Sequence, residues 1–342
     1  MKPRNTLILF LIAAALGAYI FFYERHQEVS EEGEEKQERA HLFDFEVAEA
    51  QAAEIRAGDG PAIRLTKSEE GWSVVAEGGK VYKADKALVE DYFETLRGIE
   101  AAHLIEEGDV KAEQFGLADP QKRVSVRGSS KDTPWQHILL IGDEMPIGSR
   151  RYVMVEGGKA VRMLDSYVVR QLDKKVTDFR PKEIVSFDKS KVAGIEFSHY
   201  QGGKIRLARK EGNWSLEAPT GGGEIDPAKA DRLLEDLSLL RVSSFPGEDV
   251  GDGRKFGLDK PTRKYVLSDE AGKELVRLEF GNKKEGADGG YYVRATGQEE
   301  VLLVSGYSAD GLPKTLEDLR PPPPPEPSAE SSSGPSGEAP AP

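Results

Sequence analysis

The sequence predicts an α+β fold of two tandem homologous domains, each an antiparallel sheet with one longer and one or two short helices, plus one N-terminal transmembrane helix. Three observations lead to this prediction. The chain repeats its motifs over a long interval, each copy mixes strand-like alternation with capped helical stretches, and an apolar run follows the N-terminus. A length of 342 residues is sufficient for two or three domains.

Internal repetition gives the domain organisation, because short motifs return in the same order at spacings of 140 to 142 residues. The repeated motifs are Ile63-Arg64-Leu65 and Ile205-Arg206-Leu207, Trp72 and Trp214, Phe115-Gly116-Leu117 and Phe256-Gly257-Leu258, Tyr152-Val153 and Tyr292-Val293, and Asp178-Phe179-Arg180-Pro181 and Asp318-Leu319-Arg320-Pro321. Solenoid repeats recur roughly every 20 to 50 residues, whereas each copy here is long enough to bury its own core. We therefore predict a first α+β repeat at 41–181 and a second at 182–320.

The N-terminus predicts a membrane anchor. Lys2 and Arg4 precede an apolar run of 18 residues, 6–23, that contains no charged residue. At a rise of about 1.5 Å per residue this run spans about 27 Å, close to the hydrocarbon thickness of a bilayer. We expect an uncleaved signal anchor rather than a cleaved signal peptide, because the run continues well beyond the small residues of Ala15-Leu16-Gly17. The positive-inside rule keeps residues 1–5 in the cytoplasm. The expected location is therefore the cytoplasmic (inner) membrane, single-pass, with the bulk of the chain periplasmic or otherwise extracytoplasmic.

Two segments outside the repeats have the composition of unfolded chain. Residues 24–40 hold seven Glu against three Arg or Lys, which predicts an acidic linker. Residues 321–342 carry nine of the 20 prolines among Ser, Gly, Ala and Glu, which predicts a disordered Pro/Ser-rich tail.

Composition excludes several classes of function. A net charge of −13 argues against nucleic acid as a partner, because phosphate binding requires a concentrated basic surface. The chain contains no Cys, so disulfides, zinc–thiolate sites and thiol nucleophiles are excluded.

The hydrophobic pattern of the first copy predicts a hairpin, a capped helix, four strands and a short closing helix. The hairpin joins Ile63 and Leu65 to residues 72–75. Asp85 is the expected helix cap, and the apolar stripe of that helix is Leu88, Tyr92, Leu96 and Ile99. The expected strands are Arg123–Arg127, His137–Ile141, Tyr152–Val155 and Ala160–Leu164, and the closing helix is Tyr167–Lys174.

The second copy repeats this order after a boundary near Pro181-Lys182-Glu183. Asp226 is the expected cap, Pro227 takes the first helical position, and Leu233, Leu237 and Leu240 form the stripe. The expected strands are Lys264–Ser268, Leu275–Phe280, Tyr291–Ala295 and Val301–Val304, and the closing helix is Ser308–Leu312. Hairpin spacing between these strands indicates an antiparallel sheet with helices packed against it.

The recurring motifs are those of folding rather than chemistry. In Phe-Gly-Leu-x-x-Pro, Gly116 and Gly257 are predicted to take a positive φ after a short helical turn, while the flanking Phe and Leu enter the core. Pro120 and Pro261 then prevent the helix from continuing.

Two further repeated motifs are open to a functional interpretation as well as a structural one. Trp72 and Trp214 are expected core anchors, with a ligand platform as the alternative. Asp178 and Asp318 in the repeated Asp-x-Arg-Pro are expected to cap locally or to form ion pairs, with a charged docking edge as the alternative.

No catalytic constellation is visible. The five histidines, His26, His41, His103, His137 and His199, show no H-x-x-x-H spacing and have no counterparts between the copies. Nucleophile elbows, P-loops and dinucleotide-binding glycine motifs are missing from the sequence. We therefore predict a non-enzymatic protein with no catalytic, cofactor-binding or metal residues and no cofactor. Ligand-binding residues are not assigned.

The order of motifs resembles the bacterial family known as domain of unknown function 4340. The resemblance rests on the Trp hairpin, the capped helix, Phe-Gly-Leu-x-x-Pro, Ile141-Gly142-Asp143 and the closing helix, and it covers about residues 45–181 and 187–320. The second copy has Phe280-Gly281-Asn282 and an expanded Gly-rich turn instead. The resemblance implies an envelope protein with an N-terminal anchor that accompanies ABC transporters of the gliding-motility type. It implies no catalytic residues.

Three functional hypotheses follow. The first is an accessory or scaffold component of an envelope ABC-transporter complex, with the membrane and ABC-transporter or other envelope subunits as partners. The second is an extracytoplasmic module that binds a glycan or peptide in the inter-repeat groove, where Tyr291-Tyr292 would supply stacking surface. The third is a hydrolase without a recognisable motif.

Overall fold

A computed structural model describes residues 39–322, except residues 59, 106–110, 200–202, 247–252, 287–288 and 299. The chain divides into two compact units, unit 1 (Met1–Pro181) and unit 2 (Lys182–Pro342). The signal anchor predicted at 6–23 lies outside the described residues, as do nearly all of the predicted linker and tail. Among the described residues, no helix has both the length and the apolar character needed to cross a membrane.

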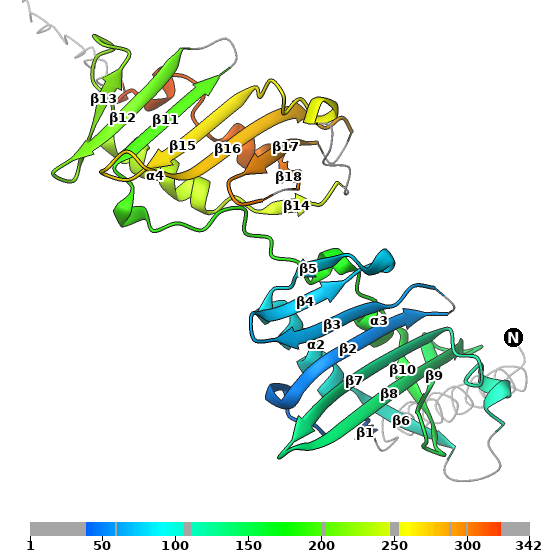
Figure 1. Ribbon diagram of the computed structural model, residues 1–342. Helices are drawn as coiled ribbons and strands as arrows, with labels where there is room; N and C mark the ends of the chain where they lie inside the picture. Colours follow the sequence, from blue (N-terminus) through cyan, green and yellow to red (C-terminus); the bar gives the residue numbers. More distant parts are fainter. Residues whose placement is uncertain are drawn as a thin grey trace, which may run out of the picture. The chain divides into compact units, whose positions relative to one another are not determined.

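Unit 1 is built on one ten-stranded sheet with the order β1-β6-β10-β9-β8-β7-β2-β3-β4-β5 (Figure 1). Its strands are β1 (Arg39–His41), β2 (Ala50–Ala57), β3 (Ile63–Ser68), β4 (Gly71–Val75), β5 (Val81–Lys83), β6 (Glu100–Ile105), β7 (Lys122–Ser130), β8 (Thr133–Glu144), β9 (Arg150–Val155) and β10 (Val161–Asp165). The helices are α2 (Lys86–Arg97) and α3 (Ser166–Leu172).

Unit 2 is built on an eight-stranded sheet with the order β13-β12-β11-β15-β16-β17-β18-β14. Its strands are β11 (Gly194–His199), β12 (Lys204–Lys210), β13 (Asn213–Ala218), β14 (Val242–Ser244), β15 (Arg263–Ser268), β16 (Glu274–Lys283), β17 (Gly290–Ala295) and β18 (Leu302–Ser305). The helices are α4 (Pro227–Ser238) and α5 (Gly306–Asp310).

The two sheets share one topology. Read from β4 to β6, the central eight strands of unit 1 follow the order of unit 2 from β13 to β14, and unit 1 adds β5 and β1 at its edges. Every strand pair is antiparallel. The predicted antiparallel α+β class is therefore confirmed.

The longer helix of each unit begins at the predicted cap. The Asp85 carboxylate accepts hydrogen bonds from the backbone N–H groups of Ala87 (2.9 Å) and Leu88 (3.4 Å). Asp226 accepts one from Ala228 at 3.0 Å, with Pro227 at the first helical position. These bonds satisfy amide groups that have no partner within the helix.

Each helix buries an apolar stripe against one face of its sheet. In α4 the buried residues include Leu233 and Leu237, as predicted, and Leu240 follows them. In α2 the stripe is shifted from the prediction: Val89, Tyr92, Phe93 and Leu96 are buried, and Leu88 is only partly so. The shift arises because Phe93 packs against the ring of Trp72, at 5.3 Å between ring centroids.

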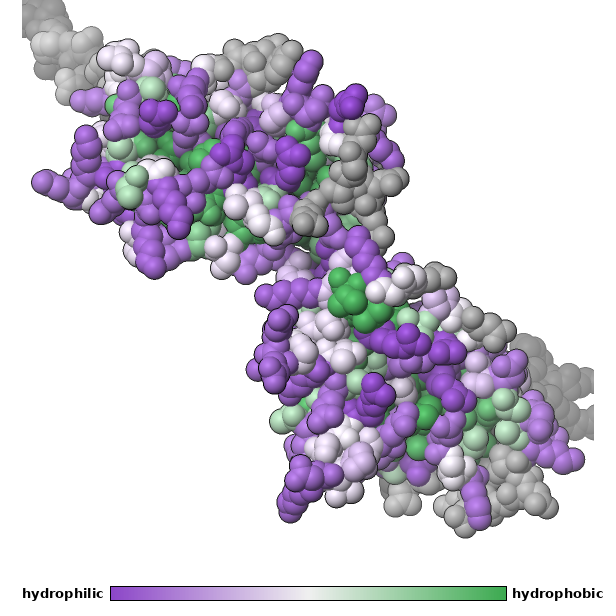
Figure 2. All heavy atoms as spheres, in the orientation of Figure 1, coloured by the Kyte–Doolittle hydropathy of each residue, from purple (hydrophilic) through white to green (hydrophobic). Residues whose placement is uncertain are grey.

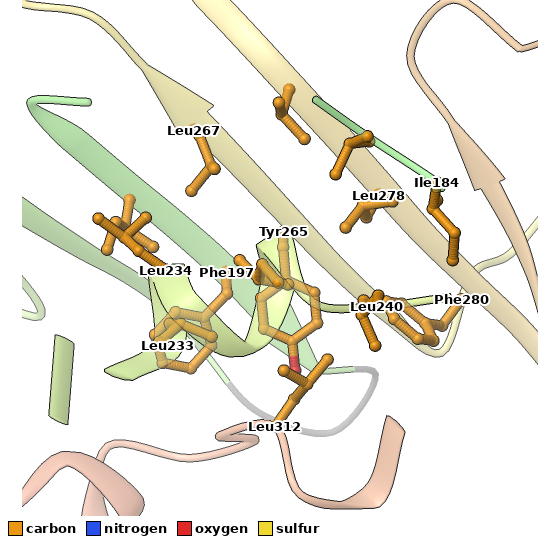
Figure 3. Close-up of a cluster of buried hydrophobic side chains, with 14 of the residues drawn as sticks. Ile184, Phe197, Leu233, Leu234, Leu240, Tyr265, Leu267, Leu278, Phe280 and Leu312 are labelled. Atoms are coloured by element: carbon orange, nitrogen blue, oxygen red, sulfur yellow. The ribbon is translucent and has the colours of Figure 1, made fainter. Parts of the chain in front are cut away.

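Figure 3 shows the core of unit 2, where the ring of Tyr265 lies among Phe197, Leu233 and Leu312. The Tyr265 hydroxyl donates to the carbonyl oxygen of Pro313 at 2.7 Å, so its polar end is satisfied inside the core. Burial raises the pKa of Tyr265 to about 12, because the charged phenolate would be poorly solvated there.

The Phe-Gly-Leu motif packs on the other face of each sheet. Leu117 forms a small cluster with Leu140 and Val161, separate from the main core, and Phe256 and Leu258 do the same in unit 2. Both motifs follow a 3-10 helix, and the φ angles of Gly116 and Gly257 are 65° and 69°. The predicted left-handed glycine is therefore confirmed, but the flanking side chains enter a second cluster rather than the main core.

A glycine in the next strand allows this motif to lie flat on the sheet. A Cβ atom added to Gly142 would be 2.1 Å from the carbonyl oxygen of Phe115, and one added to Gly281 would be 2.1 Å from that of Phe256. Both glycines lie where the strand register shifts, between Ile141 and Glu144 and between Phe280 and Lys283. The Asp-to-Asn difference at the next position therefore leaves this bulge unchanged.

Other repeated residues are structural as well. Trp72 and Trp214 are buried, which confirms them as core anchors. Asp178 accepts a hydrogen bond from the Lys175 backbone N–H at 2.7 Å, and Asp318 accepts from those of Lys314 and Thr315, both at 2.8 Å. The capping interpretation of Asp-x-Arg-Pro is therefore confirmed.

Six strands among the described residues lie outside the predicted elements: β1, β2, β5, β6, β11 and β14. The most consequential are β2 and β11, which lie near the middle of each sheet. The sequence of β2 is Ala-Gln-Ala-Ala-Glu-Ile-Arg-Ala, and alanine has a low preference for strands. Pairing with β3 and β7 on both sides overrides that preference.

Candidate interaction surface on the open sheet faces

Each sheet has one face that its helices do not cover, which we call the open face. It carries the residues that alternate with the buried core positions along the strands. In unit 1 these include Glu54, Arg56, Arg64, Arg123, Ser125, Arg127, Gln136, Ile138, Leu140, Tyr152 and Met154; in unit 2 they include Glu196, Lys204, Arg206, Lys264, Arg277, Glu279, Tyr292 and Arg294.

One ion pair occupies the same place on both open faces. The Arg64 Nε donates to Glu54 Oε2 at 2.9 Å, and Arg206 Nη2 lies 3.0 Å from Glu196 Oε2. Each pair spans directly opposed positions of neighbouring strands, β3 with β2 and β12 with β11. The Arg of the repeated Ile-Arg-Leu motif thus lies on the open face and forms a cross-strand ion pair in both units, which the sequence alone did not distinguish from the flanking core residues.

Both glutamates are held in the charged form. Partial burial alone would raise the pKa of Glu54, but hydrogen bonds from Arg64 and Arg56 outweigh it, so the pKa is lowered. Partial burial would likewise raise the pKa of Glu196, but hydrogen bonds from Lys204 and Arg206 outweigh it, so this pKa is also lowered. Each open face therefore keeps a negative centre surrounded by cations at neutral pH.

The open face of unit 1 is basic around this pair. Arg123 pairs with Glu156 at 3.0 Å, while Arg127 is exposed and forms no ion pair with any residue that the structure describes. Together with Arg64, these arginines line a hollow of about 240 Å³ above β2, β3, β7 and β8. This hollow offers more cationic groups than anionic ones, although the whole chain carries a net charge of −13.

The part of the open face over β8 and β9 in unit 1 differs in polarity from the corresponding part over β16 and β17 in unit 2. In unit 1, Leu140 and Met154 are cross-strand neighbours of β8 and β9, next to the Phe-Gly-Leu cluster. At the corresponding pair of β16 and β17, unit 2 has Glu279 and Arg294, whose charged groups lie 2.7 Å apart. Figure 2 shows hydrophilic side chains over the visible face of each unit, with apolar side chains between them.

Ion pairs of this kind contribute little to folding, since exposed pairs stabilise a protein by only about 0–1 kcal/mol each. The open face of unit 2 nevertheless carries a second network, in which Lys264 lies 3.7 Å from Glu279, beneath a hollow of about 910 Å³. Charge of this density is a candidate surface for recognition, since complementary charge steers association.

The histidines are dispersed. His41 pairs with Glu100 on exposed strands at 3.4 Å, and His137 lies among Phe43, Phe45 and Trp135. His26 and the side chain of His103 lie outside the described residues, and His199 ends β11. Across the part of the chain that the structure describes, no three His, Asp or Glu side chains converge as they would around a metal ion.

The tyrosine pair suggested as a stacking surface is split by the sheet. Tyr291 packs on the helix side, where its hydroxyl donates to Asp310 at 2.9 Å. Tyr292 packs on the open side against Phe256, at 4.8 Å between ring centroids. The two rings therefore face opposite sides of β17 and do not form one platform.

Comparison with known proteins matches the chain to one family model. No curated protein and no solved structure matched the chain. The family described as Domain of unknown function (DUF4340) matches residues 72–261 and 247–323, so that both units fall largely within the match. The chain, with its two Phe-Gly-Leu bulges and two open-faced sheets, belongs to the DUF4340 family.

Proposed function

We propose that this protein is a non-enzymatic scaffold, anchored in the cytoplasmic membrane by residues 6–23, whose two units bind protein partners outside the cytoplasm. The observation that carries the proposal is the Glu–Arg pair repeated at the same place on both open faces. Duplicated core residues follow from duplicated folding, but a duplicated exposed pair is not required for folding. Its retention in both units favours a shared binding role.

The partner that we propose is a subunit of an envelope ABC transporter. Support for this choice comes from the signal-anchor pattern of the N-terminus and from the company that the resemblance implies for such proteins. The basic hollow of unit 1 further favours a partner surface of acidic character, because complementary charge steers association and fixes its register.

The test is affinity capture of the full-length chain from detergent extracts of cells that produce the transporter. Arg123→Glu combined with Arg127→Glu reverses the charge of the unit 1 face, and we expect capture of the transporter subunit to fall at least about tenfold, with steep dependence on salt. Lys86→Glu on α2 is the matched control, because it changes an exposed cation on the helix side. Equal capture by all three proteins, or no transporter subunit in any eluate, contradicts the proposal.

The second candidate function is the binding of a small ligand. The observation in its favour is a hollow within unit 1, on the helix side of the sheet. A hydrolase stays the third candidate, and no geometric observation among the described residues favours it.

A further inference from the structure

A hollow of about 320 Å³ opens on the helix side of unit 1, where the start of β7 and the β8–β9 bulge meet α3. Its polar lining comes from Gln121 and Lys122 at the start of β7, Arg151 and Glu144 at the bulge, and Ser166, Arg170 and Asp173 on or after α3. This hollow is on the opposite side of the sheet from the open face described above, because Ile141 in its wall belongs to the main core.

Hydrogen-bond donors exceed acceptors in this lining. The Ser166 hydroxyl is buried, and it has no hydrogen-bond partner among the described residues. Arg170 forms no ion pair with a described residue, and Lys122 uses one contact, to Asp173 Oδ1 at 2.9 Å. An ammonium group has three donors and a guanidinium group has five, so unused donor capacity is left around the hollow.

Arg151 is held in place by Gln121 and Glu144, which also line the hollow, and by the backbone of Gly142. Its Nη1 donates to Gln121 Oε1 at 2.7 Å and to the carbonyl oxygen of Gly142 at 3.1 Å, and its Nη2 lies 3.8 Å from Glu144. The Nε donor is not used in these contacts. The cation is therefore positioned by the bulge, which is itself fixed by the Phe-Gly-Leu motif.

Unit 2 provides an internal comparison, because different residues take the corresponding positions. Tyr291 replaces Arg151 in the register of the bulge, and Arg263 replaces Lys122. Only 3% of Arg263 is exposed: its guanidinium group lies over the rings of Tyr291 (4.4 Å) and Phe280 (4.9 Å), and its Nη1 donates to the carbonyl oxygen of Ala309. Its Nη2 has no hydrogen-bond partner among the described residues, and the two aromatic rings lie against the guanidinium group.

The carboxylate of Asp310 is paired within unit 2. Asp310, at the position of Arg170, accepts hydrogen bonds from Tyr291 and from Lys314 at 3.1 Å, and it lies 3.6 Å from Lys283. Ser166 is replaced by Gly306, where an added Cβ would lie 3.0 Å from the carbonyl oxygen of Gly289. At this place unit 2 therefore has an arginine covered by two aromatic rings and a paired aspartate, whereas unit 1 has a hollow lined by hydrogen-bond donors.

We infer that the unit 1 hollow binds a small oxyanion, a carboxylate or phosphate group, with Ser166, Lys122, Arg151 and Arg170 as its donors. The oxygens of a carboxylate or phosphate accept hydrogen bonds, which suits a lining with more donors than acceptors. A volume of about 320 Å³ suits a group of the size of a single small metabolite and is at the low end of known ligand pockets. Glu144 and Asp173 at the edge favour a ligand that carries little additional negative charge.

The test is isothermal titration of the full-length protein in a non-ionic detergent at low salt, with sodium phosphate, sodium acetate and sodium succinate as separate probes. We expect saturable binding of at least one probe, and the three probes separate the phosphate from the carboxylate source. Ser166→Ala should weaken that binding about tenfold, since a hydrogen bond to a charged group is lost, and Arg170→Gln should weaken it about threefold. Arg232→Gln is the control, because Arg232 is an exposed cation on α4 in unit 2 and should leave binding unchanged.

Thermal unfolding distinguishes a binding role for Ser166 from a structural one. Without ligand, Ser166→Ala removes a buried hydroxyl that has no partner, so the melting temperature should rise slightly while affinity falls. The inference is overturned if no probe binds saturably, if Ser166→Ala and Arg170→Gln both bind as the unaltered protein does, or if Ser166→Ala lowers the melting temperature. Capture of the transporter subunit is measured independently and is unaffected by either outcome.

Discussion

Replacement of Gly142 by Ala tests whether the bulge that carries the Phe-Gly-Leu motif is as tightly packed as the structure indicates. The added Cβ would be 2.1 Å from the carbonyl oxygen of Phe115, whereas real Cβ contacts are essentially never below 3.0 Å. The two groups must separate by about 1 Å, and both belong to backbone. Overpacking of a core costs about 1–3 kcal/mol, and the upper end applies where no side chain can rotate away.

We expect the free energy of unfolding of unit 1 to fall by about 3 kcal/mol. For a unit of this size the melting temperature shifts by about 4 °C per kcal/mol, so the expected decrease is about 12 °C. Differential scanning calorimetry of the full-length protein measures it. Gly281→Ala should produce the same decrease in unit 2, because its Cβ would be 2.1 Å from the carbonyl oxygen of Phe256.

Gly203→Ala is the matched control. No atom lies within 4 Å of its added Cβ, and none of the three glycines has a positive φ, so the control isolates steric overlap from backbone preference. We expect Gly203→Ala to change the melting temperature by less than about 2 °C. A melting temperature of the Gly142→Ala variant within about 2 °C of that of the Gly203→Ala variant would contradict the tight packing of the bulge.

Two further predictions concern local charges. Asp85→Ala and Asp226→Ala should each lower the free energy of unfolding by about 1 kcal/mol in urea denaturation, because each leaves helix N–H groups without an acceptor, and no change in either would contradict the capping role. The lowered pKa values of Glu54 and Glu196 stabilise the folded protein above their unfolded value of 4.5, and this contribution is lost as the pH falls through the lowered folded values. Glu54→Gln combined with Glu196→Gln should therefore make stability less dependent on pH below about 5, and an unchanged pH profile would show that the pairs do not contribute.

The sequence was sufficient for those elements whose signal is local. Helix caps at Asp85 and Asp226, the left-handed glycines of Phe-Gly-Leu, and the strands of the second half of each copy all follow from short patterns that the fold obeys. The strand β2 could not be found in this way, because its alanines become a strand only through pairing with β3 and β7. By contrast, β11 does alternate, with Ile195 and Phe197 buried, and was detectable.

The candidate surfaces were harder to predict than the fold. Glu54 and Arg64 are ten residues apart in the chain and become partners only when β2 and β3 are paired in register. The unit 1 hollow depends on Arg151 standing where unit 2 has Tyr291, a difference that an alignment of the copies could have shown. The inference that the hollow binds a ligand also depends on the buried Ser166 hydroxyl without a partner among the described residues, which is visible only in the packed structure.

We propose that the open faces, rather than the helix-covered sides, bind the transporter subunit. Site-specific photo-crosslinking in cells tests it most directly, with a photoreactive residue placed on the open faces at Arg127 or Lys204 and on the exposed helix surfaces at Lys86 or Arg232. We expect crosslinks to an envelope ABC-transporter subunit from the open-face positions and none from the helix positions. Crosslinks to that subunit from the helix positions alone, or from none of the four, would contradict it.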